Sequence, residues 1–313
     1  GHMVDQYLGR HSSPGSGLTL VTSWKDAPIA KPLLGDKLPT GMTFHPDISY
    51  DAKRVIFSFC AHGDPEKDRT KRQDQVKRRR FWVYEAATDG SWIKQRTGNS
   101  ADPLTTWEDR HTVLVEDWDP CYLPDGGFAF ISTRSQGYGR CHGARYAPAY
   151  LLYRANGDGT DIRQLSFGEA NEWDPAVLND GRIVFSRWDY IDRNNTIFQS
   201  LWTTRPDGTA TAHFYGNYTP GPCMLAESAP IPGSPQILST ATDHHGSTKG
   251  SILMIDPRLG LDGSKPLRKL TPELGFLEGR PPAGTRETPM PLHGMDVGRG
   301  RKAATPFPLT EEM

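Results

Sequence analysis

The sequence has little of what marks several large classes of protein. Its 36 Lys and Arg residues are balanced by 37 Asp and Glu residues, so the formal net charge of −1 lacks the basic excess that nucleic-acid binding normally needs. It contains no run of about 18 apolar residues, which a membrane-spanning helix requires. It also has no P-loop, dinucleotide fingerprint or Gly-x-Ser-x-Gly elbow. We therefore expect neither a nucleic-acid partner nor a membrane span.

Cysteine is scarce as well. The four cysteines are Cys60, Cys121, Cys141 and Cys223, and none stands in Cys-x-x-Cys or Cys-x-x-Cys-His spacing. This argues against a disulfide scaffold, a zinc ribbon and a c-type haem attachment site, so no haem is expected in this segment. A single disulfide between Cys121 and Cys141 stays open, because both flank one predicted hairpin and sequence alone does not fix connectivity.

What the chain does have is turn chemistry and a repeat. It contains 32 Gly and 26 Pro residues, which is typical of many short strands joined by tight turns. Residues 116–130 and 171–185 both read Trp-Asp-Pro, a short strand, Asp-Gly and a second strand. Each copy continues into another hairpin with its own Asp-Gly turn, a strong hairpin signal because Gly readily adopts a positive φ. Two successive hairpins make a four-stranded meander, which needs neighbouring copies to bury its faces.

Two looser copies complete the pattern, so the sequence predicts an all-β fold: a β-propeller of four-stranded blades. About four blade units are visible, near residues 40–98, 110–168, 169–217 and 228–272. We interpret residues 1–3 as a cloning scar, 4–38 as an N-terminal extension and 39–274 as the blades. The Pro- and Gly-rich residues 275–313 lead into a truncated further blade, which opens near Thr305. An incomplete ring exposes apolar blade faces, so we expect an oligomer.

A series of short motifs, several of them built on Asp-Pro, Asp-Gly or Ser-x-Arg, runs through the chain in a fixed order. They lie at residues 117–120, 123–126, 132–134, 172–175, 179–182, 187–190, 215–217, 230–233, 244–246 and 306–309. In that order they resemble the TolB-like (PD40, WD40-like) propeller repeats, and more specifically the middle domain of the hydrazine synthase alpha subunit. The resemblance implies a natural ring of six or seven blades and neighbouring domains in a larger protein. It also implies an export signal on the precursor, and therefore a periplasmic or secreted location.

Acidic residues open the inner strands of two repeats. Asp117, Asp119, Glu172 and Asp174 flank the two Trp-Asp-Pro motifs, so they are expected to gather at one mouth of a propeller channel. One reading is structural, with Asp119 and Asp174 accepting backbone N–H bonds in Asx-type turns. The other is functional: clustered carboxylates bind a hard cation such as Ca²⁺, and one of them gains the raised pKa of a general acid. On that reading Asp119 and Asp174 are catalytic candidates, and Asp117 is a candidate metal ligand.

A histidine pair interrupts the repeat. His244 and His245 lie between two predicted strands, where a plain hairpin would suffice. Imidazole is a ligand for Zn²⁺ and Mn²⁺, so both residues are candidate metal ligands and catalytic residues, with His45 from another blade as a further ligand. Adjacent strand residues point to opposite faces, so only one of the pair is expected to ligate. A hydrogen-bonded structural pair is the alternative. The cofactor hypothesis is therefore a divalent metal, Ca, Zn or Mn.

Two arginines and two tryptophans complete the candidate site. Arg134 and Arg187 are expected at the same place in successive repeats, either gripping a small anionic ligand such as a uronate or forming structural ion pairs. Trp118 and Trp173 either stack on a sugar ring or fill the blade core. Two functions stay open: a non-catalytic binding or scaffold module, and a metal-assisted lyase or glycosidase that acts on acidic glycans.

Overall fold

The computed structural model describes residues 7–23, 27–62, 79–100, 102, 114–137, 139, 148–169, 171–192, 198–219, 221–244, 248–274 and 302–309. In these ranges the regular structure is β-strand, with short 3-10 turns at Gly9–His11, Gly35–Lys37 and Pro257–Leu259. No helix in this part of the chain is long and apolar enough to cross a membrane. The all-β prediction is thus confirmed.

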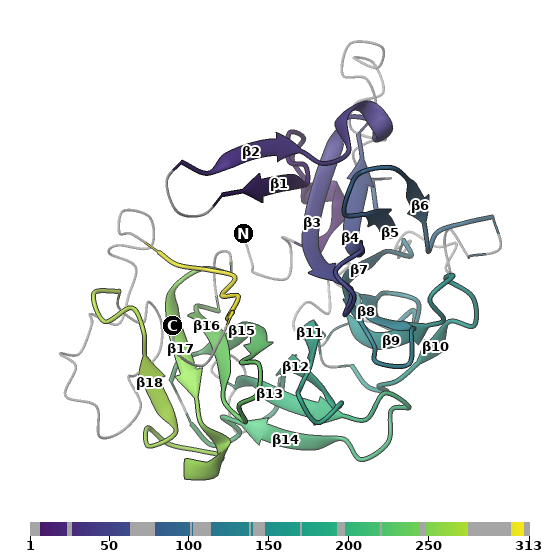
Figure 1. Cartoon of the computed structure of the whole chain (residues 1–313). Coiled ribbons are helices and arrows are strands. Elements are labelled where there is room, and N and C mark those ends of the chain that lie inside the picture. The colour runs from purple at the N-terminus through teal and green to yellow at the C-terminus, as the bar shows by residue number, and fades with distance from the viewer. Residues whose placement is uncertain are drawn as a thin grey trace. The chain divides into compact units, whose positions relative to one another are not determined.

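The strands form four blades, each of four antiparallel strands in chain order (Figure 1). Blade 1 consists of β3 (Gly41–Ile48), β4 (Arg54–Ala61), β5 (Phe81–Ala87) and β6 (Ile93–Gln95). Blade 2 consists of β7 (Asp117–Tyr122), β8 (Phe128–Ser132), β9 (Leu151–Ala155) and β10 (Arg163–Gln164). Blade 3 consists of β11 (Asn171–Val177), β12 (Ile183–Trp188), β13 (Gln199–Thr204) and β14 (Ala212–Tyr215). Blade 4 consists of β15 (Met224–Pro230), β16 (Ile237–Thr242), β17 (Ser251–Ile255) and β18 (Leu267–Lys269). A separate hairpin, β1 (Thr19–Thr22) with β2 (Ile29–Pro32), lies in the N-terminal extension.

The blades divide between two compact units. The first unit, Val4–Gln136 with Tyr153–Arg163, holds blade 1 and most of blade 2. The second unit, Gly137–Leu152 with Gln164–Met313, holds blades 3 and 4 and the first residues of β9. In the second unit one parallel pairing, Gln199 with Met224, links blade 3 to blade 4.

Each unit has its own apolar core. Most of its residues come from strands, where successive side chains point to opposite faces of the sheet and one face is buried. In the first unit Val55, Phe57 and Phe59 of β4 pack with Leu34 and Ala86. In the second unit the core takes residues from both blades, including Val184, Leu201, Leu225, Leu253 and Ile255. Burying these faces against one another is the main stabilisation available to four-stranded sheets that would otherwise expose an apolar side.

The innermost strand of every blade breaks at the same place. A register shift falls after Phe44, Trp118, Trp173 and Ala226, so each strand carries a β-bulge. The next residue is left-handed in all four blades, and we call these the bulge residues: His45 (φ 44°), Asp119 (φ 50°), Asp174 (φ 50°) and Glu227 (φ 50°). Positive φ is uncommon outside glycine, and Asp and His are among the residues that tolerate it best.

The fourth blade starts earlier than expected. Its innermost strand is β15, which begins at Met224, so the expected start at residue 228 is wrong. The second strand of this blade is β16, which pairs with β15 along its length. The sequence pattern did not reveal this start, because Ala226-Glu227-Ser228 stands where other blades have Trp-Asp-Pro. The left-handed backbone is kept at Glu227, but the recognisable side chains are absent.

Substituting two left-handed glycines distinguishes the cost of backbone strain from the cost of side-chain crowding. Gly98 (φ +77°) and Gly126 (φ +89°) are both left-handed, but a Cβ on Gly98 would lie 2.1 Å from Cδ2 of Trp82, whereas Gly126 faces open space. We expect Gly126→Ala to cost about 1 kcal/mol through strain alone. Gly98→Ala should cost a further 1–3 kcal/mol or so, because it overpacks the ring. Urea unfolding followed by tryptophan fluorescence measures both, and equal losses would contradict the crowding.

Candidate functional site

In the first unit, two bulge residues meet. His45 Nδ1 contacts Asp119 Oδ1, and the Asp119 amide donates to Ser58 Oγ at 3.0 Å. Burial lowers the pKa of His45 to about 3, so the ring is neutral and its contact with Asp119 is not an ion pair. The ligand atoms of the two residues lie within 4.8 Å of one another. A neutral imidazole beside a carboxylate is a donor set that suits a transition metal.

In the second unit, the equivalent residues hold backbone groups. Asp174 Oδ2 accepts from the amide of Glu227 at 3.0 Å. Glu227 Oε2 in turn accepts from Thr240 Oγ1 at 2.9 Å and from the amide of Thr305 at 2.5 Å. The carboxylate of one bulge residue therefore fixes the amide of the next. For Asp174 this arrangement corresponds to the structural alternative, a side chain that accepts backbone N–H bonds.

A second set of side-chain acceptors joins neighbouring blades three residues before the bulge. Glu116 Oε2 accepts from the amides of Gly9 at 2.8 Å and Phe81 at 3.0 Å, and Phe81 begins the third strand of blade 1. Asn171 Oδ1 accepts at 3.1 Å from the amide of Tyr150, which directly precedes the third strand of blade 2. Sequence reasoning missed both roles, although their equal spacing from the Asp-Pro motif was a usable signal.

Glu172 adds to this joint. Its Oε2 accepts from the amide of Leu152 at 3.0 Å and from the hydroxyl of Ser166. Its residue is only 2% exposed. Burial raises the pKa of Glu172 to about 7, although the bonds from Ser166 and Leu152 and the charge of Arg187 oppose that rise. The raised pKa thus has a structural origin.

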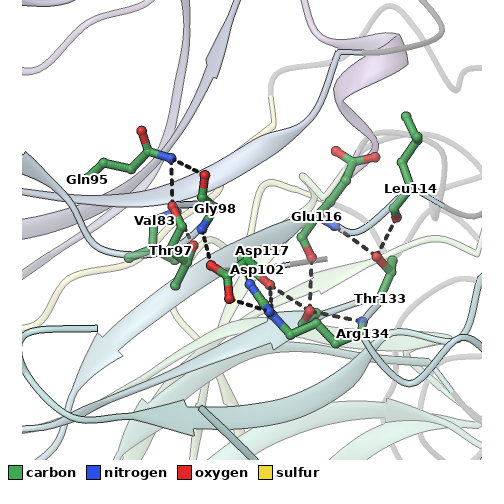
Figure 2. Close-up of polar contacts among 11 residues, drawn as sticks. Val83, Gln95, Thr97, Gly98, Asp102, Leu114, Glu116, Asp117, Thr133 and Arg134 are labelled. Atoms are coloured by element: carbon green, nitrogen blue, oxygen red, sulfur yellow. Dashed lines mark hydrogen bonds and ion pairs between the residues drawn. The ribbon is translucent and has the colours of Figure 1, made fainter. Parts of the chain in front are cut away.

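Arg134 is the centre of a buried network in the first unit (Figure 2). Its Nη2 and Nε bind the two carboxylate oxygens of Asp117 at 2.6 and 3.0 Å, and its Nη1 binds Asp102 Oδ1 at 2.9 Å. Asp102 Oδ2 accepts from the amide of Gly98 at 2.6 Å, just beyond β6. The guanidinium group therefore ties the outer strand of blade 1 to the innermost strand of blade 2. Asp117, a candidate metal ligand from the sequence, lies in this network.

The expected equivalence of Arg134 and Arg187 is wrong. Arg187 pairs in register with Glu172, and the corresponding partner of Asp117 is Ser132, so Arg134 lies two residues beyond the matching place. The two serines that suggested the equivalence do not correspond, because Ser186 pairs with Trp173 whereas Ser132 pairs with Asp117. Arg187 Nε instead binds Asp189 Oδ1 at 3.0 Å, and its Cζ lies 4.8 Å from the ring centroid of Trp202.

The two candidate tryptophans lie in the core. Trp118 and Trp173 are both 0% exposed, so neither offers a ring face to a sugar in this structure. Trp118 stacks on Tyr7 and Trp173 packs edge-on against Tyr150, each with ring centroids 6.4 Å apart. Both tryptophans therefore fill the blade core, which was the other interpretation of these residues.

The histidine and cysteine candidates are only partly described. His244 is 3% exposed, packs edge-on against Trp188 at 4.9 Å and has Nδ1 2.8 Å from Gln199 Nε2. His245 and Cys141 lie outside the described residues. Cys121 is a buried thiol, and burial raises its pKa well above the usual value. His244, which the sequence predicted as a metal ligand, thus has Gln199 as a protein partner at its Nδ1 atom.

Taken with the blade architecture, these joints define a β-propeller. No family model matches the sequence, and no curated protein matches it. Among solved structures, the hydrazine synthase of Kuenenia stuttgartiensis superposes with a TM-score of 0.55 and 16% identity, over 77% of this chain and 34% of that chain. The chain thus spans about a third of the hydrazine synthase chain that it matches. At this identity the likeness shows the fold alone.

Two further solved structures are similar over most of the chain. A putative TolB from Agrobacterium tumefaciens has a TM-score of 0.48 and 16% identity, over 83% of this chain and 79% of that chain. An oligogalacturonate lyase in complex with manganese has a TM-score of 0.44 and 10% identity, over 74% of this chain and 53% of that chain.

Removing Arg134 tests the blade joint. Arg134→Ala leaves the fully buried Asp117 carboxylate without its cation, so we expect a loss of about 3–5 kcal/mol in the free energy of unfolding. Arg154→Ala is the matched control, because the side chain of its partner Asp125 is 52% exposed and such a pair contributes less than about 1 kcal/mol. Chemical denaturation measures both variants. Similar losses would show that the Arg134 network does not join the blades.

Glu172 should make stability depend on pH. Its folded pKa of about 7 exceeds the unfolded value of 4.5, so the folded state binds the extra proton and stability falls as pH rises between these values. The loss above pH 7 is roughly 3 kcal/mol at most. Glu172→Gln keeps an acceptor for Leu152 but cannot ionise, so its urea midpoint should fall less between pH 5 and 8. Parallel pH profiles for the two proteins would contradict this assignment.

Proposed function

We propose that the chain is a non-catalytic binding and docking module of a larger extracytoplasmic protein. The observation that carries this proposal is that several charged candidate side chains are bound by other groups of the protein. Arg134 is bound by two carboxylates, and its side chain is only 9% exposed. Glu116 and Glu172 each accept two bonds at a joint between blades. A catalytic acid or an anion-binding arginine must instead present its polar atoms to a substrate.

The larger context supports a module of this kind. The matched part of the hydrazine synthase chain is a third of its length, and the rest lies outside the likeness. A rigid all-β scaffold with loops at its strand ends is well suited to hold neighbouring domains or a small anionic ligand. A periplasmic or secreted location and domain partners belong to this proposal.

A metal-assisted enzyme is the second candidate, favoured by the contact of His45 with Asp119. These residues would hold a divalent cation such as Mn²⁺, Zn²⁺ or Ca²⁺, which supplies Lewis-acid activation of a substrate oxygen when bound. Cleavage of an acidic glycan also needs cationic groups that face the substrate. Arg134 and Arg187 both have carboxylate partners in the protein, so this requirement weighs against the candidate.

One experiment separates the two. The purified chain is dialysed against Mn²⁺, Zn²⁺ or Ca²⁺, analysed for bound metal, and assayed for new reducing ends and unsaturated products on a panel of polyuronates and sulfated glycans. A binding module should give no turnover with any metal. Turnover that His45→Ala abolishes, and His213→Ala in the other unit does not, would establish the enzyme instead.

A further inference from the structure

The turn between β9 and β10 of blade 2 contains the single Asn-Gly pair of the sequence, Asn156-Gly157 (Figure 1). An asparagine side chain can react with the amide nitrogen of the next residue and close a five-membered succinimide ring. Glycine at that next position favours the reaction, because it has no side chain to hinder the close approach of the two groups. Asn156 is exposed, so water can reach the ring and open it.

The amide of Gly157 has no hydrogen-bond acceptor among the residues that the structure describes. The bonds of the turn form on either side of it. The amide of Asn156 donates to the carbonyl of Thr160 at 2.9 Å, and the amide of Gly159 donates to the carbonyl of Asn156 at 2.8 Å. An amide nitrogen must lose its proton to attack a carbonyl carbon, and a bonded proton is lost less readily. The nitrogen of Gly157 therefore lacks this protection.

The six Asp-Gly pairs of the sequence provide a contrast, because aspartate can close the same ring with loss of water. In five of them the glycine amide donates to the carbonyl three residues earlier, at 2.8–3.1 Å. The aspartate Oδ1 in these five accepts the amide two residues later, at 2.8–3.1 Å. In the sixth pair the amide of Gly263 donates to Thr219 Oγ1 at 2.7 Å. The pairs lie at residues 89–90, 125–126, 158–159, 180–181, 207–208 and 262–263.

One contact restrains the side chain of Asn156. Its Nδ2 donates to Thr160 Oγ1 at 3.1 Å, and the Thr160 hydroxyl donates to Asp158 Oδ1 at 2.6 Å. The side chain must rotate to bring its Cγ atom onto the nitrogen of Gly157, and the bond to Thr160 opposes that rotation. Loss of this bond should therefore speed the reaction.

The turn has little room for a longer backbone. A Cβ atom on Gly157 would overlap the carbonyl oxygen of Gly126, in the turn between β7 and β8. A Cβ atom on Gly159 would overlap the carbonyl oxygen of Arg96, directly after β6 of blade 1. Isoaspartate inserts one extra carbon into the main chain, so the turn must move away from at least one of these carbonyls. Such a change should weaken the packing of blade 2 against blade 1.

We propose that Asn156 is a self-modification site that converts to aspartate and isoaspartate. The nitrogen of Gly157 attacks Cγ of Asn156, the bond from Cγ to Nδ2 breaks, and ammonia leaves with the proton of the Gly157 amide. Water then adds its hydroxyl to one ring carbonyl and its proton to the ring nitrogen. The turn gains one negative charge, and no oxidant, reductant or cofactor takes part. The reaction does not depend on what the chain binds.

The test is incubation of the folded full chain at neutral pH, followed by peptide mapping and labelling with an isoaspartate methyltransferase. Isoaspartate should accumulate at residue 156 and not at the six Asp-Gly pairs. Asn156→Gln should abolish it, because the longer side chain cannot close a five-membered ring. Thr160→Val should raise the rate about fivefold, which is the rate equivalent of one net hydrogen bond. Thr209→Val, which loses the equivalent bond to Asp207 in blade 3, should leave the rate unchanged.

The chain unfolded in urea is the reference for the folded one. If residue 156 is modified in urea but stays asparagine in the folded chain, the fold protects it and the proposal is wrong. Equal isoaspartate at residue 156 and at the Asp-Gly pairs of the folded chain would refute the role of the Gly157 amide. The isoaspartate form, separated by ion exchange, should melt below the Asn156→Asp variant, which has the same charge without the extra carbon. Equal melting temperatures would refute the effect on the packing of the two blades.

Discussion

The structure depends on one recurring interaction, a buried side-chain oxygen that accepts a backbone N–H from the neighbouring blade. The side chains of four residues make such bonds: Glu116, Asn171, Glu172 and Asp174. A four-stranded sheet leaves polar backbone groups at its margins, and a margin buried against another sheet must satisfy them. Apolar packing between blades has no direction, so these bonds fix the register in which one blade sits against the next.

The same constraint explains why acidic residues are so frequent along the inner strands. In an ordinary globular enzyme, a buried carboxylate with a raised pKa would suggest catalysis. Here Glu172 has that property because it is buried at a joint between blades, where its bonds from Leu152 and Ser166 lower the pKa only in part. His45 is the departure from the pattern, since imidazole replaces the carboxylate at a bulge position and faces Asp119. His45 therefore gives blade 1 a chemistry that the carboxylates at the other bulge positions do not provide.

Much of the fold could be predicted, because hairpins in this chain carry local signals. Asp-Gly turns marked the hairpins of blades 2 and 3 correctly. The start of blade 4 could not be found the same way, because left-handed backbone at Glu227 leaves no recognisable trace in Ala226-Glu227-Ser228. The partners of Arg134 and Asp117 depend on where β8 ends, which is a tertiary outcome. The roles of Trp118 and Trp173 could not be decided from the sequence, because tryptophan serves equally well to fill a core and to stack on a ligand.

The bulge has a consequence for how such a protein can diversify. At these positions the backbone conformation is the same, and the side chain is His, Asp or Glu. Each blade therefore contributes one position at which the side chain differs while the bulge is kept. Gene duplication of a blade would multiply such sites without requiring a new architecture.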